Sequence, residues 1–156
     1  YDKIYIVKQF QVILSEVTSM KKFSFFVSGE SNITFRESIH GRVDSNVLKK
    51  SIEKNVRKCK KNNIDLWVED IFIEGKEIEI IFKGKKRGIF ASKKHIPDAI
   101  TCFTYGCIWE NPDEFVTAKR EKMEEKYGCK FTPNIIAQMG NEESDKTFII
   151  VTLWKK

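Results

Sequence analysis

The sequence predicts an α+β fold, in which a mostly antiparallel sheet built from hairpins is packed on one face by three to four helices. Two observations lead to this prediction. Short runs of β-branched and aromatic residues come in adjacent pairs, which is typical of hairpins. Longer segments repeat their apolar residues every three or four positions, as amphipathic helices do. With 156 residues, the chain fits one domain, and we expect residues 1–156 to form it.

The first segment, residues 4–20, is ambiguous between two patterns. Ile6, Phe10 and Ile13 recur at helical spacing, whereas the apolar residues from Phe10 to Leu14 alternate as in a strand. Length favours a helix, because a strand over the whole segment would be unusually long. We therefore predict a helix here.

The next segments predict a hairpin and then a helix. Residues 23–27 and 33–36 flank a cluster of Gly, Ser and Asn, as hairpin strands do, and residues 37–43 are expected to form a connection. Asp44 is suited to cap a helix over residues 46–61. The apolar stripe expected to dock this helix consists of Leu48, Ile52, Val56 and Cys59.

The clearest hairpin pairs residues 64–73 with residues 77–83. Gly75 lies between them, where a tight turn requires a positive φ. A basic loop over residues 83–94 is expected to follow. The alternating faces of the first strand are Leu66, Val68 and Phe72 on one side and Trp67, Glu69, Ile71 and Ile73 on the other, and those of the second are Ile78, Ile80 and Phe82 against Glu77, Glu79 and Ile81.

Two helices and two strands are predicted in the second half. Pro97 and Asp98 are typical of a helix start, and Asn111 precedes another that would end at Gly128. Strands over residues 129–139 and 147–154 follow, joined by a polar loop, and Pro133 indicates that the first of them lies at a sheet edge. No internal repeat or linker is visible. The buried stripe of the first helix would be Ile96, Ile100, Phe103 and Cys107.

Charge is the strongest functional signal. The chain has 28 basic and 22 acidic residues, a formal net charge of +6, which attracts polyanions. Residues 46–61 and 83–94 hold thirteen of the basic residues, separated by a single hairpin. Because several cations must act together on a phosphate backbone, we predict that both segments form a nucleic-acid interface. Its residues are Lys50, Lys54, Arg57, Lys58, Lys61, Lys85, Lys86, Arg87, Lys93 and Lys94.

Bases could also be recognised beside this interface. Trp67, Phe90 and Tyr105 are the aromatic residues that could stack on unpaired bases. The glycines that bracket the basic loop would let a phosphate approach backbone N–H groups. The alternative is that the lysine-rich helix face is only solvated and keeps the protein soluble.

Catalytic chemistry has little support. His40 and His95 could cleave RNA by proton transfer, provided that both rings reach one phosphate. The sequence contains none of the common phosphate-binding, dinucleotide, nucleophile-elbow or zinc-protease motifs. We expect a protein that is not an enzyme and holds no cofactor or metal. The hairpin carboxylates that could instead bind Mg²⁺ are Glu69, Asp70, Glu74, Glu77 and Glu79.

The cysteines argue against a zinc site. Cys59, Cys102, Cys107 and Cys129 form no C-x-x-C pair and lie near neither histidine in the sequence. We expect free thiols, three of them on apolar helix positions. In a secreted chain, two disulfides with three connectivities are the alternative, and the sequon at Asn32 would then accept a glycan.

A second class of function is a protein-interaction or assembly domain of a larger, secreted or membrane-anchored component. The chain begins at Tyr1, and we interpret residues 1–156 as a fragment or mature portion of a larger protein. No apolar stretch reaches the ~20 residues that cross a bilayer. We expect a nucleic acid or a protein as partner, no transmembrane segment in this chain, and a cytoplasmic location slightly ahead of an extracellular or periplasmic one.

Overall fold

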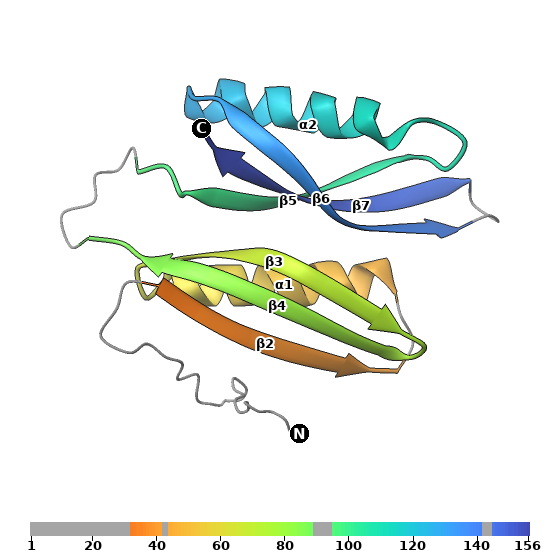
Figure 1. Ribbon diagram of the computed structural model, residues 1–156, viewed down its shortest axis with the longest axis horizontal. Helices are drawn as coiled ribbons and strands as arrows, with labels where there is room; N and C mark the ends of the chain where they lie inside the picture. The colour runs from red at the N-terminus through yellow and green to blue at the C-terminus, as the bar shows by residue number, and fades with distance from the viewer. Residues whose placement is uncertain (1–31, 42–43, 89–94, 142–144) are drawn as a thin grey trace. The chain divides into compact units, whose positions relative to one another are not determined.

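The computed structural model describes residues 32–41, 44–88, 95–141 and 145–156 (Figure 1). The chain divides into two compact units, Tyr1–Phe90 and Ala91–Lys156, and each is described by itself. The single domain expected over residues 1–156 stays a prediction. The elements of the first unit are β2 (Asn32–His40), α1 (Ser45–Lys60), β3 (Ile64–Glu74) and β4 (Glu77–Lys86), and those of the second are β5 (Ala99–Cys107), α2 (Pro112–Tyr127), β6 (Phe131–Asn141) and β7 (Lys146–Lys155).

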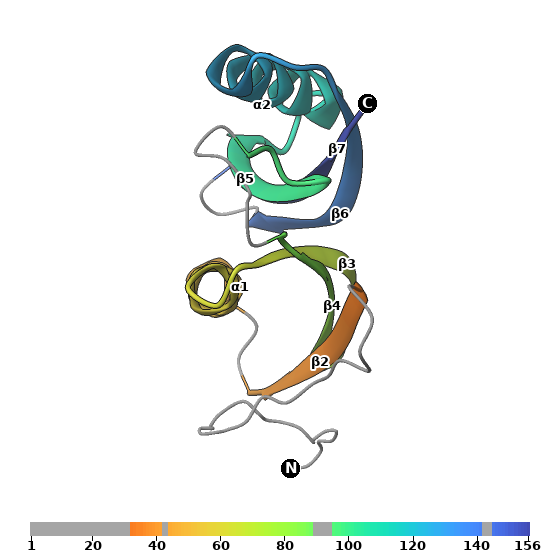
Figure 2. The same cartoon turned by 90° about the vertical axis from the view of Figure 1, so that its left-hand side faces the viewer.

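The first unit is an antiparallel sheet in the order β2-β4-β3, with α1 on one face (Figure 2). The side chain of Asp44 caps α1 by accepting the backbone N–H of Asn46, as predicted. Phe35 and Phe82 stack inside this unit with ring centroids 4.8 Å apart. The buried apolar residues are Ile33, Phe35, Leu48, Ile52, Cys59, Leu66, Trp67, Val68, Ile71, Ile78, Ile80 and Phe82.

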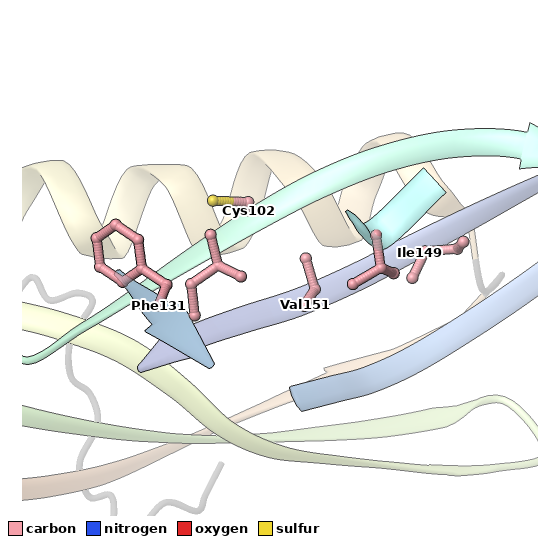
Figure 3. Close-up of a cluster of buried hydrophobic side chains, with 6 residues drawn as sticks. Cys102, Phe131, Ile149 and Val151 are labelled. Atoms are coloured by element: carbon pink, nitrogen blue, oxygen red, sulfur yellow. The ribbon is translucent and has the colours of Figure 1, made fainter. Parts of the chain in front are cut away.

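The second unit has an antiparallel sheet in the order β5-β7-β6, covered by α2 (Figure 1). The predicted ends of α2 are confirmed: Asn111 caps its start, and Gly128 ends it with φ 70°. Strand β6 lies at a sheet edge, as Pro133 indicated. The core consists of Cys102, Val116, Phe131, Ile149, Val151 and Leu153 (Figure 3).

The predicted fold class is wrong. The described residues form two sheets of three antiparallel strands and two helices, rather than one sheet covered by three to four helices. The segment that opens at Pro97 is strand β5, because residues 100–105 are mostly β-branched or aromatic and pair along β7. Cys102 and Cys107 are therefore strand residues. The helix predicted over residues 4–20 and the strand over residues 23–27 lie outside the described residues.

Two boundaries and the faces of one strand in the first unit also differ from the prediction. The connection expected over residues 37–43 is strand up to His40, which pairs with Glu77. The loop expected from residue 83 begins only after Lys86, because β4 pairs with β2 up to Lys85 and with β3 up to Lys86. A bulge in β3 between Val68 and Asp70 reverses the faces beyond it, so that Ile71 is buried and Phe72 is 52% exposed.

Candidate nucleic-acid interface

The exposed face of α1 carries a line of cations. Lys50, Lys54, Arg57 and Lys61 are spaced four, three and four residues apart and are all exposed. Side chains at this spacing lie on one side of a helix. The line, which we call the α1 stripe, is about 16 Å long at 1.5 Å per residue. None of its four cations forms an ion pair with another residue of the described chain.

The end of β4 comes close to the end of α1. The backbone N–H of Arg87 donates to the carbonyl of Asn63 over 2.8 Å, and Lys86 pairs with Ile64. Arg57, Lys58 and Lys60 occupy the last turn of the helix, where cations also complement the helix dipole. The structure therefore brings the last turn of α1 together with Lys86.

Lys85 faces the other way. The α1 side of the sheet is identified by Glu37, which pairs with Ile80 across the sheet and contacts α1. Side chains alternate between the two faces along β4, so Lys86, at an even distance from Ile80, lies on the same face as Ile80, whereas Lys85 lies on the other face. The side chain of Lys85 thus lies on the sheet face opposite α1, away from the α1 stripe.

Arg87 is held by a carboxylate. Its Nε lies 2.8 Å from Oδ1 of Asp65, and both side chains are largely buried. A guanidinium in such a pair is not available as a separate phosphate ligand. Lys93 and Lys94 lie outside the described residues. Of the ten predicted residues, Lys86 lies on the α1 side of the sheet beside Ile64, and five belong to α1 or its C-cap: Lys50, Lys54, Arg57, Lys58 and Lys61.

A buried carboxylate lies beneath α1. Glu37 accepts hydrogen bonds from Ser51 Oγ, over 2.8 Å, and from Asn55 Nδ2, both on α1. Burial raises the pKa of Glu37, and the two hydrogen bonds and the charges of Lys54 and Lys58 oppose that rise. Sequence analysis missed this residue because it placed residues 37–43 in a connection. The alternation of Ile33, Phe35, Glu37 and Ile39 was the signal that could have placed it on the inner face.

None of the aromatic residues proposed for base stacking is an exposed residue among those described in the first unit. Trp67 is 6% exposed, and Phe90 lies outside the described residues. Tyr105 is exposed but belongs to the second unit, where it packs against Phe148. The basic surface as described can therefore contact phosphates but offers no platform for bases.

The comparisons with known proteins found no match. No family model, no curated protein and no solved structure matches the chain. The function is therefore inferred from the geometry of the surface. Among the described residues, no helix is both long and apolar enough to span a membrane.

The two candidate catalytic histidines do not belong to the same unit. His40 belongs to the first unit and His95 to the second. No cluster of three or more His, Cys, Asp or Glu side chains suited to a metal occurs in the described part of the chain. The four cysteines are free thiols, and burial raises the pKa of Cys59 to about 12 and that of Cys102 to about 11. Both thiols stay protonated and unreactive near neutral pH.

Proposed function

We propose that this protein is a non-catalytic module that contacts the backbone of a nucleic acid through the α1 stripe and Lys86. The observation that carries the proposal is the stripe itself, four exposed cations in line with no described ion-pair partner. Helix α1 has six basic residues and one acidic residue, whereas α2 has four basic and five acidic residues. The basic surface thus belongs to one helix and does not reflect the composition of the whole chain.

The length of the stripe favours a polymer over a single phosphate. Over about 16 Å, duplex DNA presents roughly ten phosphates, since it carries one charge per ~1.7 Å. Four cations in line can neutralise several of these together, which one small anion cannot exploit. Because no exposed aromatic residue is described beside the stripe, the contact reads the backbone and not the base sequence.

A second candidate is a protein-interaction domain. Both described sheets leave strands at their edges: β2 and β3 in the first unit, β5 and β6 in the second. Edge strands present backbone groups to which another chain can add a strand. This candidate predicts no dependence on Lys50 or Lys54, so the experiment below separates the two.

The test is a titration with a fluorescent DNA duplex of about 20 base pairs and with its single strand, at about 50 and 200 mM salt. The variant replaces Lys50, Lys54, Arg57 and Lys61 by Gln. We expect the wild type to bind the duplex at micromolar concentration or tighter and to lose about 100-fold in affinity between the two salt concentrations, as about four phosphate contacts require. The variant should bind at least about 10-fold more weakly at low salt, with stability lowered by no more than about 1 kcal/mol through the loss of charge at the end of α1.

A matched control removes the same net charge from the second unit. It replaces Lys122, Lys126, Lys146 and Lys156, which are all exposed, by Gln. The control should retain wild-type affinity within about threefold, because none of its substitutions touches the α1 stripe. Equal losses in both variants, or no binding of either nucleic acid at low salt, would remove the proposal.

A further inference from the structure

The two units contain the same succession of elements with the same lengths. Strands β2 and β5 have 9 residues each, and helices α1 and α2 have 16 each. Strands β3 and β6 have 11 residues each, and β4 and β7 have 10 each. Both sheets place the last strand of the unit in the middle, between the first strand and the strand that follows the helix.

The strands also pair in the same register. A shift of 67 positions carries the starts of β2, α1 and β3 onto those of β5, α2 and β6, and a shift of 69 carries β4 onto β7. Under these shifts, the pair His40–Glu77 becomes the observed pair Cys107–Lys146. The pair Ile64–Lys86 likewise becomes the observed pair Phe131–Lys155.

Two local irregularities coincide as well. The bulge of β3 between Val68 and Asp70 corresponds to the bulge of β6 between Ile135 and Ala137. The N-cap Asp44 corresponds to the N-cap Asn111, and each side chain accepts the N–H two residues ahead. A bulge inserts one residue at one place in a strand, so its position is independent of the lengths of the elements.

We infer that residues 32–86 and 99–155 are two tandem copies of one β-α-β-β module, each a folding unit with its own core, and that the copies have diverged in what their helices bind. We call them the first and the second module. The difference in what the helices bind rests on the proposed function, whereas the independent folding of the two copies does not. Little sequence identity remains between the copies. Among the matched positions that are identical, Ile33-Thr34 corresponds to Ile100-Thr101, and Ile80-Ile81 corresponds to Ile149-Ile150.

Paired changes in side-chain size support a common ancestor. Gly106 leaves room for the ring of Phe115, which would lie 2.5 Å from a Cβ at residue 106. The matched positions of the first module hold Ile39 and Leu48. Two aliphatic side chains of equal size, one on the strand and one on the helix, have thus been exchanged for glycine on the strand and a phenyl ring on the helix. The ring occupies the space that a side chain at residue 106 would need.

The helices have diverged in charge at matched exposed positions. Lys50 and Lys54 on α1 correspond to Thr117 and Glu121 on α2, all four of them exposed. Arg57 is exposed, whereas the matched Glu124 is only 11% exposed and accepts hydrogen bonds from the N–H of Phe131 and from Arg120. Lys61 corresponds to Gly128. The cationic line of α1 therefore has no counterpart at the matched positions of α2.

The independent folding of the two copies is tested in the full chain by hydrogen exchange with Ile80→Ala and Ile149→Ala, which alter matched, fully buried residues. Each substitution should accelerate exchange in its own module by about 30-fold or more, and in the other module by less than about threefold. If a variant does not fold, Ile80→Val and Ile149→Val give the same comparison at about 2- to 10-fold. Equal acceleration in both modules by either variant of a pair overturns the inference.

The difference in what the helices bind is tested by moving the charge. In the variant whose α1 stripe is replaced by Gln, we add Thr117→Lys, Glu121→Lys and Glu125→Lys on exposed positions of α2. Duplex binding should return to within about threefold of the wild type, because the cations again lie in line on a helix of the same scaffold. The control adds the same charge away from a single line, as Glu110→Lys, Glu114→Lys and Thr132→Lys, and should restore less than a tenth of the affinity.

The outcomes separate this inference from the proposed function. If the α1 variant loses binding and the folded variant with lysines added on α2 does not recover it, the divergence of the two helices is wrong. The proposed function is not affected by that result. If the wild type does not bind, the proposed function is wrong, and so is the divergence of the helices in nucleic-acid binding. Hydrogen exchange then tests by itself whether the two modules fold as separate units.

Discussion

The two modules share a backbone and differ in the sheet face that their own helix leaves uncovered. In the first module this face carries Arg36, Glu79, Lys83 and Lys85, and Arg36 and Glu79 form an ion pair across the strands at 3.1 Å. The matched positions of the second module hold Phe103, Phe148, Thr152 and Trp154. Phe148 packs there against Phe103 and Tyr105. The pairing register is the same in both, so it does not depend on the polarity of this face.

The central strands show what the register does depend on. Strand β4 alternates buried and more exposed residues, whereas β7 is buried from Thr147 to Leu153. Both strands keep an apolar row toward their helix, with Ile80 and Phe82 in one and Ile149 and Val151 in the other. A strand slipped by one residue would turn this row away from the helix. The buried row of the central strand is therefore what the two modules share, and the opposite row of that strand is free to diverge.

The largest expected effect tests the importance of the buried row in each copy. Phe82→Ala should cost about 3–5 kcal/mol of unfolding free energy, and Val151→Ala at the matched position about 2 kcal/mol, because a smaller group is removed. Phe82 also loses its stack on Phe35. Both losses of unfolding free energy can be measured by denaturant titration, together with hydrogen exchange followed separately in each module. A larger loss for Val151→Ala would mean that the two rows are not equivalent.

The second-largest expected effect concerns the contact between Gly106 on β5 and Phe115 on α2. Gly106→Ala would place a Cβ 2.5 Å from the ring of Phe115 and should cost about 1–3 kcal/mol. In a Phe115→Leu background, which copies Leu48 of the first module, the same change should cost less than about 1 kcal/mol. Gly88→Ala, with no atom within 4 Å of the new Cβ, is the control and should change stability by no more than about 0.5 kcal/mol. Equal costs in the two backgrounds would refute the compensation.

The buried carboxylate distinguishes the first module in its response to pH. Burial raises the folded-state pKa of Glu37, so wild-type stability is full below the unfolded pKa and is lost as pH rises through the raised value. Glu37→Gln removes this titration. Its melting temperature relative to the wild type should therefore increase from about pH 4 to about pH 8. A difference that stays flat or decreases over this range would show that the buried group does not titrate in this way.

The carboxylate of the second module should respond with the opposite sign. The backbone N–H of Phe131 and the side chain of Arg120 lower the pKa of Glu124. Its contribution is present above the unfolded pKa and is lost as pH falls through the lowered value. Glu124→Gln should lower the melting temperature near neutral pH, and the deficit should disappear in acid. A deficit that persists at the lowest pH would assign the effect to packing instead of charge.

The caps of α1 and α2 and the turn at Gly75 were predicted correctly from the sequence. Asp44, Asn111 and Gly128 were assigned to helix ends, and Gly75 to a turn, where it has φ 62°. These assignments depend on hydrogen bonds and backbone angles within a few residues, so neighbouring residues determine them. The cationic line on α1 was also predictable, because the apolar stripe of a helix fixes which residues face outward.

Assignments that depended on a distant partner were wrong or were missed. The helix predicted from Pro97 is a strand because β7, some fifty residues later, provides the pairing. Lys85 and Arg87 could be removed from the interface only once the register of β4 and the position of Asp65 were known. The repeat was invisible in the sequence because so few matched residues remain identical.

The sequence by itself thus determined the caps of α1 and α2, the turn at Gly75 and the charge of α1, since each depends on residues close together along the chain. Only the tertiary structure decided the number of sheets, the face on which each lysine lies and the equivalence of the two modules. These follow from strand register, which is fixed by contacts between residues far apart in the chain. Both modules retained that register although nearly all of their side chains changed.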